Sequence, residues 1–189
     1  LASEDPLFGF HIGQQLMIAR YGLVSHAMIG SATLDDAFKL MVQYQELVGN
    51  MGHIERLQTA DGCWLVWQLT HENPVLRRHI TENIFSMLLQ VLRLATGNPQ
   101  SAPTCIEFNH ASPGSLQQQE MERFFLCPLR FDAPGHRMFL PGALLQTVLN
   151  SFEQSFSRQL ESELVRQLRA LHEQDTLSGR VRHQLRLAM

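Results

Sequence analysis

The stretch HIERLQTADGCWLVWQLT, residues 53–70, decides the fold class because it is typical of two strands joined by a tight turn. Ala60-Asp-Gly62 is a hairpin signal between a strand expected at 53–60 and another at 63–70. In the second strand, every other side chain points to the same face of the sheet. One face carries Cys63, Leu65, Trp67 and Leu69, and the other carries Trp64, Val66, Gln68 and Thr70.

Amphipathic helices are expected on both sides of this hairpin. Thr33 is placed to cap a helix at 33–48, and the two aspartates in its first turn suit the positive end of the helix dipole. Asn73-Pro74 opens a second helix at 74–96, with asparagine as the cap and proline in the first turn. A shorter helix is expected within residues 6–20.

The first half of the chain is predicted to have the order strand, helix, strand, strand. Its first strand is residues 22–30, GLVSHAMIG, because they are apolar and bounded by glycines. The second half repeats the order with a strand at 104–110, a helix at 115–125, and strands at 128–132 and 136–140. Its helix is expected to begin with a capping box, formed by Ser115 and Gln118.

Two such units predict an α+β fold with a mixed or antiparallel sheet. The helices are expected to pack on one face of the sheet, and a long C-terminal helix is expected to follow the second unit. The other face would be free to curve around a ligand.

The long final helix is predicted from about Gly142 to Glu173, because leucine and phenylalanine recur there at steps of three and four. One interpretation is a helix that packs along its own domain. The other, favoured by the length of the stripe, is an antiparallel contact with the same helix of a second copy. The expected dimer contacts are Leu145, Leu149, Phe152, Phe156 and Leu160.

The predicted domain organisation is an effector-binding and dimerisation domain at 1–173, a linker at 174–179, and the start of another unit at 180–189. Hydrophobic residues are 44% of the chain and charged residues 17%, which is a globular composition. The formal net charge of -3 does not suit a free-standing nucleic-acid binder. No stretch is long and apolar enough to span a membrane.

The sequence favours binding over catalysis. The three cysteines are odd in number and widely spaced, which indicates free thiols in a reducing cytoplasm. Histidines and cysteines lack metal-ligand spacing, and phosphate-loop, dinucleotide and nucleophile-elbow motifs are absent, so no metal, cofactor or enzyme activity is expected. Cys105 and His110 would point to opposite faces of one strand and could not pair as nucleophile and base.

Several side chains are candidates for a ligand pocket. Trp64 and Gln68 share one strand face and are favoured as pocket lining, whereas Trp67 faces the other side; core packing is an equal alternative for either tryptophan. His26 is a ligand candidate, although a structural role is favoured. Arg56 is a candidate partner for an anionic ligand, with a solvated surface role favoured.

Four segments resemble one large group of AraC-type transcription regulators that carry an arabinose-binding-like N-terminal domain. The segment YGLVSHAMIGSATLDDAF at 21–38 resembles its opening, and IEFNHASP at 106–113 is similar to its Phe-x-His-x-x-Pro segment. FFLCPLRF at 124–131 is similar to its aromatic-Gly-x-Pro-Val-x-Phe segment, although Leu126 stands where the family often has glycine. SGRVRHQL at 178–185 resembles the first helix of the DNA-binding domain.

This resemblance implies a bacterial, cytoplasmic regulator whose sensor domain binds a small effector and forms a homodimer. DNA would be bound only by a following domain with two helix-turn-helix motifs. The alternatives are a stand-alone small-molecule-binding protein, an enzyme that uses a carboxylate such as Glu107, and a dimerisation module without a ligand. The effector is not identified, although a pocket with tryptophan, glutamine and methionine would suit a partly apolar molecule.

Overall fold

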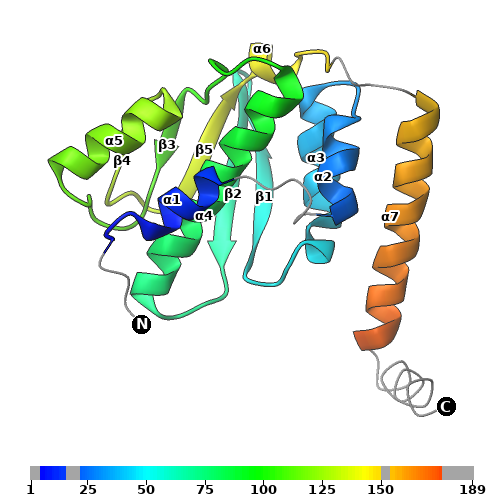
Figure 1. Ribbon diagram of the computed structural model, residues 1–189, viewed down its shortest axis with the longest axis horizontal. Coiled ribbons are helices and arrows are strands. Elements are labelled where there is room, and N and C mark those ends of the chain that lie inside the picture. The colour runs from blue at the N-terminus through cyan, green and yellow to red at the C-terminus, as the bar shows by residue number, and fades with distance from the viewer. Residues whose placement is uncertain (1–4, 16–21, 150–153, 176–189) are drawn as a thin grey trace.

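The computed structural model describes residues 5–15, 22–149 and 154–175, and it has an α+β fold, as predicted. Figure 1 shows the arrangement of its helices and strands. The elements in chain order are α1 (Phe8–Gln14), α2 (Gly22–Ile29), α3 (Leu34–Tyr44), the 3-10 helix η2 (Gln45–Leu47), β1 (Gly52–Gln58), β2 (Gly62–Leu69), α4 (Pro74–Thr96), β3 (Cys105–Glu107), α5 (Ser115–Phe125), β4 (Leu129–Arg130), β5 (His136–Pro141), α6 (Gly142–Leu145) and α7 (Gln154–Asp175).

The five strands form one mixed sheet in the order β1-β2-β5-β3-β4. All neighbouring pairs are antiparallel except β3 and β4, which are parallel. The predicted hairpin is confirmed, with Gln58 opposite Cys63. Cys63, Leu65 and Trp67 are buried, because α4 packs against this face of the sheet (Figure 1). The other face of β2 carries the half-buried Trp64 and the exposed Gln68.

The central helix α4 begins and ends as the sequence predicts. The Asn73 side chain accepts hydrogen bonds from the backbone N–H groups of Val75 and Leu76, which satisfies two donors that have no partner within the helix. Gly97 ends the helix with a φ of 63°, a left-handed conformation that glycine adopts at little cost. The N-terminal α1 packs on α4, and a Cβ atom at its Gly9 would overlap the backbone of His79.

The prediction of a strand at 22–30 is wrong, because these residues form the helix α2. The buried positions of α2 are Val24, Ser25, Ala27 and Met28, which follow helical spacing. A short apolar run does not distinguish a buried strand from a buried helix by its periodicity. Helices α3, α4 and α7 all contact α2. Because it is covered on several sides, α2 lacks the continuous polar face that would have shown a helical period in the sequence.

The prediction of one unbroken helix at 142–173 is also wrong. Helix α6 ends at Leu145, and the backbone of residues 147–149 then pairs with residues 32–34. The Leu34 N–H donates to the Thr147 carbonyl at 3.1 Å, and the Leu149 N–H donates to the Ala32 carbonyl at 3.0 Å. The backbone of residues 147–149 thus bonds to residues 32–34 and does not continue the helix.

The structure places the expected dimer contacts in different environments. Leu145 and Leu149 are buried in the domain's own core. Phe152 lies outside the described residues, and Phe156 belongs to α7. Leu160, with Leu164 one turn later, is buried where α7 packs against α2 and η2.

Helix α7 continues through Asp175, so the first two positions of the predicted linker at 174–179 are helical. The segment at 178–185 that resembles a DNA-binding domain lies outside the described residues. In the second half, β3 is shorter than the strand predicted at 104–110. The helix α5 begins at the predicted residue, but the predicted capping box of Ser115 and Gln118 is wrong. Gly114 is the cap and makes no side-chain capping bond, and the Gln118 side chain accepts a hydrogen bond from the Ser112 hydroxyl at 3.1 Å.

Candidate functional site

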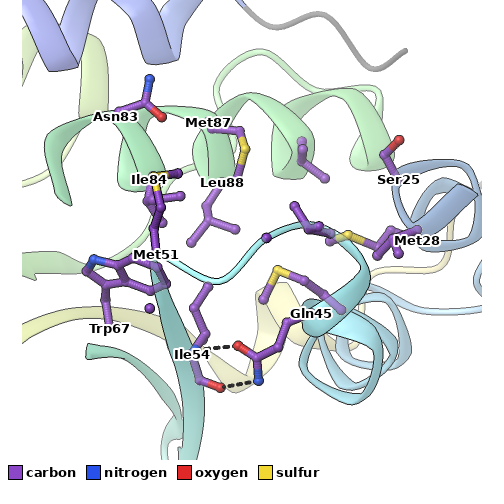
Figure 2. Close-up of a pocket in the computed structure, with 16 residues that line it drawn as sticks. Ser25, Met28, Gln45, Met51, Ile54, Trp67, Asn83, Ile84, Met87 and Leu88 are labelled. Atoms are coloured by element: carbon purple, nitrogen blue, oxygen red, sulfur yellow. Dashed lines mark hydrogen bonds between the residues drawn. The ribbon is translucent and has the colours of Figure 1, made fainter. Parts of the chain in front are cut away.

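An apolar pocket lies between the sheet and the helices that cover it (Figure 2). Its volume is about 140 Å³, and α2, α3, α4, β1, β2 and the η2–β1 segment all contribute to its wall. The lining residues are Val24, Ser25, Met28, Met41, Gln45, Val48, Gly49, Met51, Gly52, Ile54, Trp67, Asn83, Ile84, Met87, Leu88 and Val91. The pocket therefore lies on the opposite side of the sheet from the ligand site expected from the sequence.

Helical spacing directs most of the apolar side chains into this pocket. Ile84, Met87, Leu88 and Val91 are three or four residues apart, so they share one face of α4. Val24 and Met28 do the same on α2. Four of the lining residues are methionines, whose unbranched and polarisable side chains adapt to irregular shapes.

The polar groups in the wall are few, and the most prominent one is already occupied. The Ile54 N–H donates to Oε1 of Gln45 at 2.6 Å, and Nε2 of Gln45 donates to the Ile54 carbonyl at 3.1 Å and to the Val42 carbonyl at 3.0 Å. Figure 2 shows the two bonds to Ile54 as dashed lines. This amide fixes η2 to β1, and none of the described residues that line the pocket is ionisable.

Trp67 forms one wall of the pocket. A Cβ atom at Gly52 would lie 2.7 Å from the Trp67 ring, so glycine at that position leaves room for the indole. The indole nitrogen is buried and has no hydrogen-bond partner among the described residues. In Figure 2 this nitrogen lies on the edge of the ring away from Gln45, so the pocket meets the carbon face and edge of the indole.

Of the residues proposed from the sequence as ligand contacts, Trp67 lines this pocket and the other four do not. Trp64 lies on the helix-free face, where Phe139 packs at 5.0 Å between ring centroids and the Arg137 guanidinium lies 4.2 Å above the ring. Gln68 is exposed on the same face.

Arg56 and His26 have local partners. The Arg56 guanidinium forms an ion pair with Asp35 of α3, and both side chains are largely buried. His26 is exposed on α2, and its Nδ1 lies 2.9 Å from the Gly22 carbonyl oxygen.

The sequence analysis missed most of the pocket. The contribution of α2 was hidden by the strand prediction for 22–30, and Met51 comes from a segment between predicted elements. The helical stripe of α4 was found, but its spacing alone does not distinguish a core face from a pocket wall. The eight methionines of the chain are the signal in the sequence that fits an adaptable apolar site.

A second group of polar side chains is buried beside the pocket, where α4 meets β5 and the segment after β3. Glu82 accepts a hydrogen bond from Nε of Arg78 at 2.8 Å, and its burial raises the pKa of the carboxyl group. The His110 ring lies 6.0 Å from the His136 ring, between centroids. Burial lowers the pKa of both imidazoles, that of His136 to about 4. These imidazoles are therefore neutral at pH 7.

On the helix-free face, Glu107 is buried beneath two arginines. Nε of Arg137 donates to one carboxylate oxygen at 2.7 Å, and Nη1 of Arg130 donates to the other at 3.3 Å. Both oxygens are thus engaged in ion pairs, which gives this carboxylate a structural role. Within the described ranges, no cluster of histidine, cysteine and acidic residues has the geometry to hold a metal ion.

No helix in the described part of the chain is long and apolar enough to cross a bilayer.

Comparison with known proteins identifies the family. Residues 1–149 match the arabinose-binding domain found at the N-terminus of AraC transcription regulators. Among solved structures, the fold is similar to that of the transcriptional regulator CdpR from Pseudomonas aeruginosa, with a TM-score of 0.69 and 16% sequence identity. The similarity covers 88% of this chain and 56% of CdpR, so the chain spans little more than half the length of that regulator.

None of the curated proteins compared with the sequence matches it significantly. The family match covers most of the chain, including every strand and the helices α1 to α6. The chain therefore belongs to the family of arabinose-binding N-terminal domains of AraC transcription regulators.

Proposed function

We propose that this chain is the effector-sensing part of an AraC-type regulator and that the effector binds in the apolar pocket between α2, α4 and β2. The observation that carries the proposal is the pocket itself, which lies between the sheet and the helices that cover it. The apolar side chains around an unfilled space lack packing contacts on that side. A bound ligand would supply part of those contacts.

The position of α2 supports a route from the pocket to the C-terminal helix. Val24, Ser25 and Met28 line the pocket, and α2 also packs against α7. The Ser157 hydroxyl donates to the carbonyl of Gly30, directly after α2, at 2.5 Å. A ligand that moves α2 would therefore shift α7, which leads toward the C-terminal part of the chain.

DNA binding and dimerisation belong to the same proposal. A net charge of -3 does not favour nucleic-acid binding by this chain itself, so in this proposal a following domain supplies the DNA contacts in the cytoplasm. A homodimer would bring two such domains together, and α7 is the element we propose to carry that contact. In this proposal, residues 1–173 form the sensing and dimerisation domain, and the linker follows them. The proposed activity is binding, without catalysis.

Pocket-filling variants test the site. In Val24→Phe the larger ring would occupy the pocket, whereas Gln68→Ala alters the helix-free face and leaves the pocket unchanged. Thermal-shift screening of the chain against a small-molecule library should yield ligands that stabilise the wild type and Gln68→Ala but not Val24→Phe. If ligands stabilise Val24→Phe and lose their effect in Gln68→Ala, the effector site lies on the other face and the proposal is wrong.

A further inference from the structure

We infer that the pocket accepts an uncharged, apolar group, such as a short alkyl chain or a small ring, and that it does not accept a sugar. This inference rests on the proposed function, because it names the ligand class of the same site. It also separates this chain from the description of its family, which refers to arabinose binding.

The first argument is the lack of hydrogen-bonding partners in the wall. The Gln45 amide is occupied by the backbone of Ile54 and Val42, and the Ser25 hydroxyl donates to the Gly22 carbonyl at 2.9 Å. Asn83 is the remaining polar side chain among the lining residues. A pentose carries several hydroxyl groups, and each one buried without a partner weakens binding.

The second argument is size and shape. The pocket is close in volume to an engineered protein cavity of about 150 Å³ that stays dry and binds benzene. Met28, Met41, Met51 and Met87 can adjust to the outline of an alkyl chain or a ring. Because none of the lining residues in the described ranges is ionisable, a charged group would lose its hydration and find no opposite charge there.

The third argument concerns the mouth of the pocket. Met51 and Val48 are 53% and 41% exposed, and they lie where the pocket opens to solvent. A polar groove lined by Gln43, Glu46, Asn50, His53 and Leu171 shares Gln45, Gly49 and Gly52 with the pocket. The polar end of an effector could therefore remain hydrated in this groove, beside α7, while its apolar end enters the pocket.

Tryptophan fluorescence can test this inference directly. The chain has two tryptophans, and Trp64→Phe on the helix-free face leaves Trp67 in the pocket wall as the single reporter. The probes are 1-hexanol, hexane-1,6-diol and L-arabinose. We expect a saturable change with 1-hexanol, at least about tenfold weaker binding of the diol because its second hydroxyl is buried unpaired, and no change with arabinose.

Two further variants complete the test. Met87→Ala enlarges the pocket, so the chain length that binds best should increase by about two or three carbons, whereas Val24→Phe should abolish the change. Saturable binding of arabinose, or equal binding of hexanol and the diol, would overturn the ligand class and leave the sensing function in place. If Val24→Phe binds hexanol as the wild type does, the pocket is not the site and the proposed function fails with it.

Discussion

At the residue scale, Arg56 shows how a candidate ligand contact can have a structural role. It lies on the buried side of β1 opposite Leu65, and its guanidinium forms an ion pair with Asp35 at the start of α3. Lys39 joins the same carboxylate at 2.6 Å. The sequence showed an arginine within a strand, but the partner that determines its role is 21 residues away and comes from another element.

Replacing Arg56 by leucine should destabilise the domain by about 2–3 kcal/mol. Loss of one partner from a buried ion pair typically costs about 3–5 kcal/mol, and Lys39 would retain part of the interaction with Asp35. The double variant Arg56→Leu with Asp35→Asn should recover most of the loss. Urea denaturation of both, with the exposed Arg169→Leu as control, checks this; a double variant less stable than Arg56→Leu would contradict it.

His136 gives the domain a pH-dependent stability. The Asn109 N–H donates to Nδ1 of His136 at 3.2 Å, which fits the neutral ring, and burial lowers the pKa to about 4 from 6.5. Because the folded-state pKa is below the unfolded one, stability is fully present above pH 6.5 and falls between pH 6.5 and 4. We expect His136 to lower the free energy of unfolding by about 2 kcal/mol at pH 5 relative to pH 7.

The measurement is urea denaturation of the wild type and His136→Gln at pH 7 and pH 5. The difference between the two proteins isolates His136 from the buried Glu82, whose raised pKa acts in the opposite direction. His136→Gln should lose less stability on acidification than the wild type does, and the exposed control His53→Gln should behave as the wild type. Equal losses in His136→Gln and the wild type would show that His136 does not carry the effect.

At the element scale, local signals predicted the boundaries that depend on local chemistry. The Ala60-Asp-Gly62 turn fixed the hairpin, and the Thr33 and Asn73 caps marked the starts of α3 and α4 because their side chains bond to nearby backbone N–H groups. The strand predicted at 22–30 failed because its conformation depends on the helices around it. The prediction of an unbroken helix at 142–173 failed for the same reason, because the backbone after α6 bonds to residues 32–34.

The end of α5 retains a strained residue. Leu126 has a φ of 56° at the helix C-terminus, and its N–H donates to the Glu122 carbonyl at 2.9 Å. A left-handed conformation costs a non-glycine residue about 1–2 kcal/mol. The side chain is 44% exposed, so little burial offsets that cost.

Leu126→Gly should therefore stabilise the domain by about 0.5–1 kcal/mol, after allowance for the greater freedom of glycine in the unfolded chain. In a chain of this size that corresponds to a melting temperature about 1–4 °C higher. The matched control is Leu116→Gly in the same helix, which is 74% exposed, has a negative φ and should lose about 1 kcal/mol. If both variants lose stability, the strain at Leu126 is too small to matter.

At the scale of the whole molecule, the sequence predicted the fold class, whereas the apolar pocket lies on the other side of the sheet from the Trp64 and Gln68 face that the sequence favoured for a ligand. Strand alternation correctly separated Trp64 from Trp67. Strand alternation does not show where the covering helices leave a pocket, because that depends on how α2, α3 and α4 fit against β1 and β2. A pocket is space left by several elements at once, whereas sequence periodicity describes one element at a time.

The same arrangement predicts how pocket occupancy reaches the end of the domain. Helix α2 lines the pocket and contacts α7. The 3-10 helix η2 is fixed to β1 by Gln45, and its Glu46 carboxylate lies 2.7 Å from Nε2 of His172 in α7. A ligand that orders α2 and η2 should therefore order α7, although α7 contributes no residue to the pocket wall. Saturating 1-hexanol should slow amide hydrogen exchange in α2, α4 and α7.

Helix α5 contributes no residue to the pocket and serves as the internal control, whose exchange should not change. Leu164 is fully buried where α7 packs, so Leu164→Ala should loosen that contact and remove the effect on α7 while the effect on α2 and α4 remains. Slower exchange that stops at α2 and α4 in the wild type would contradict the route. In that case the pocket would bind its ligand without transmitting the event toward the C-terminus, and the regulatory contact would have to lie on another element.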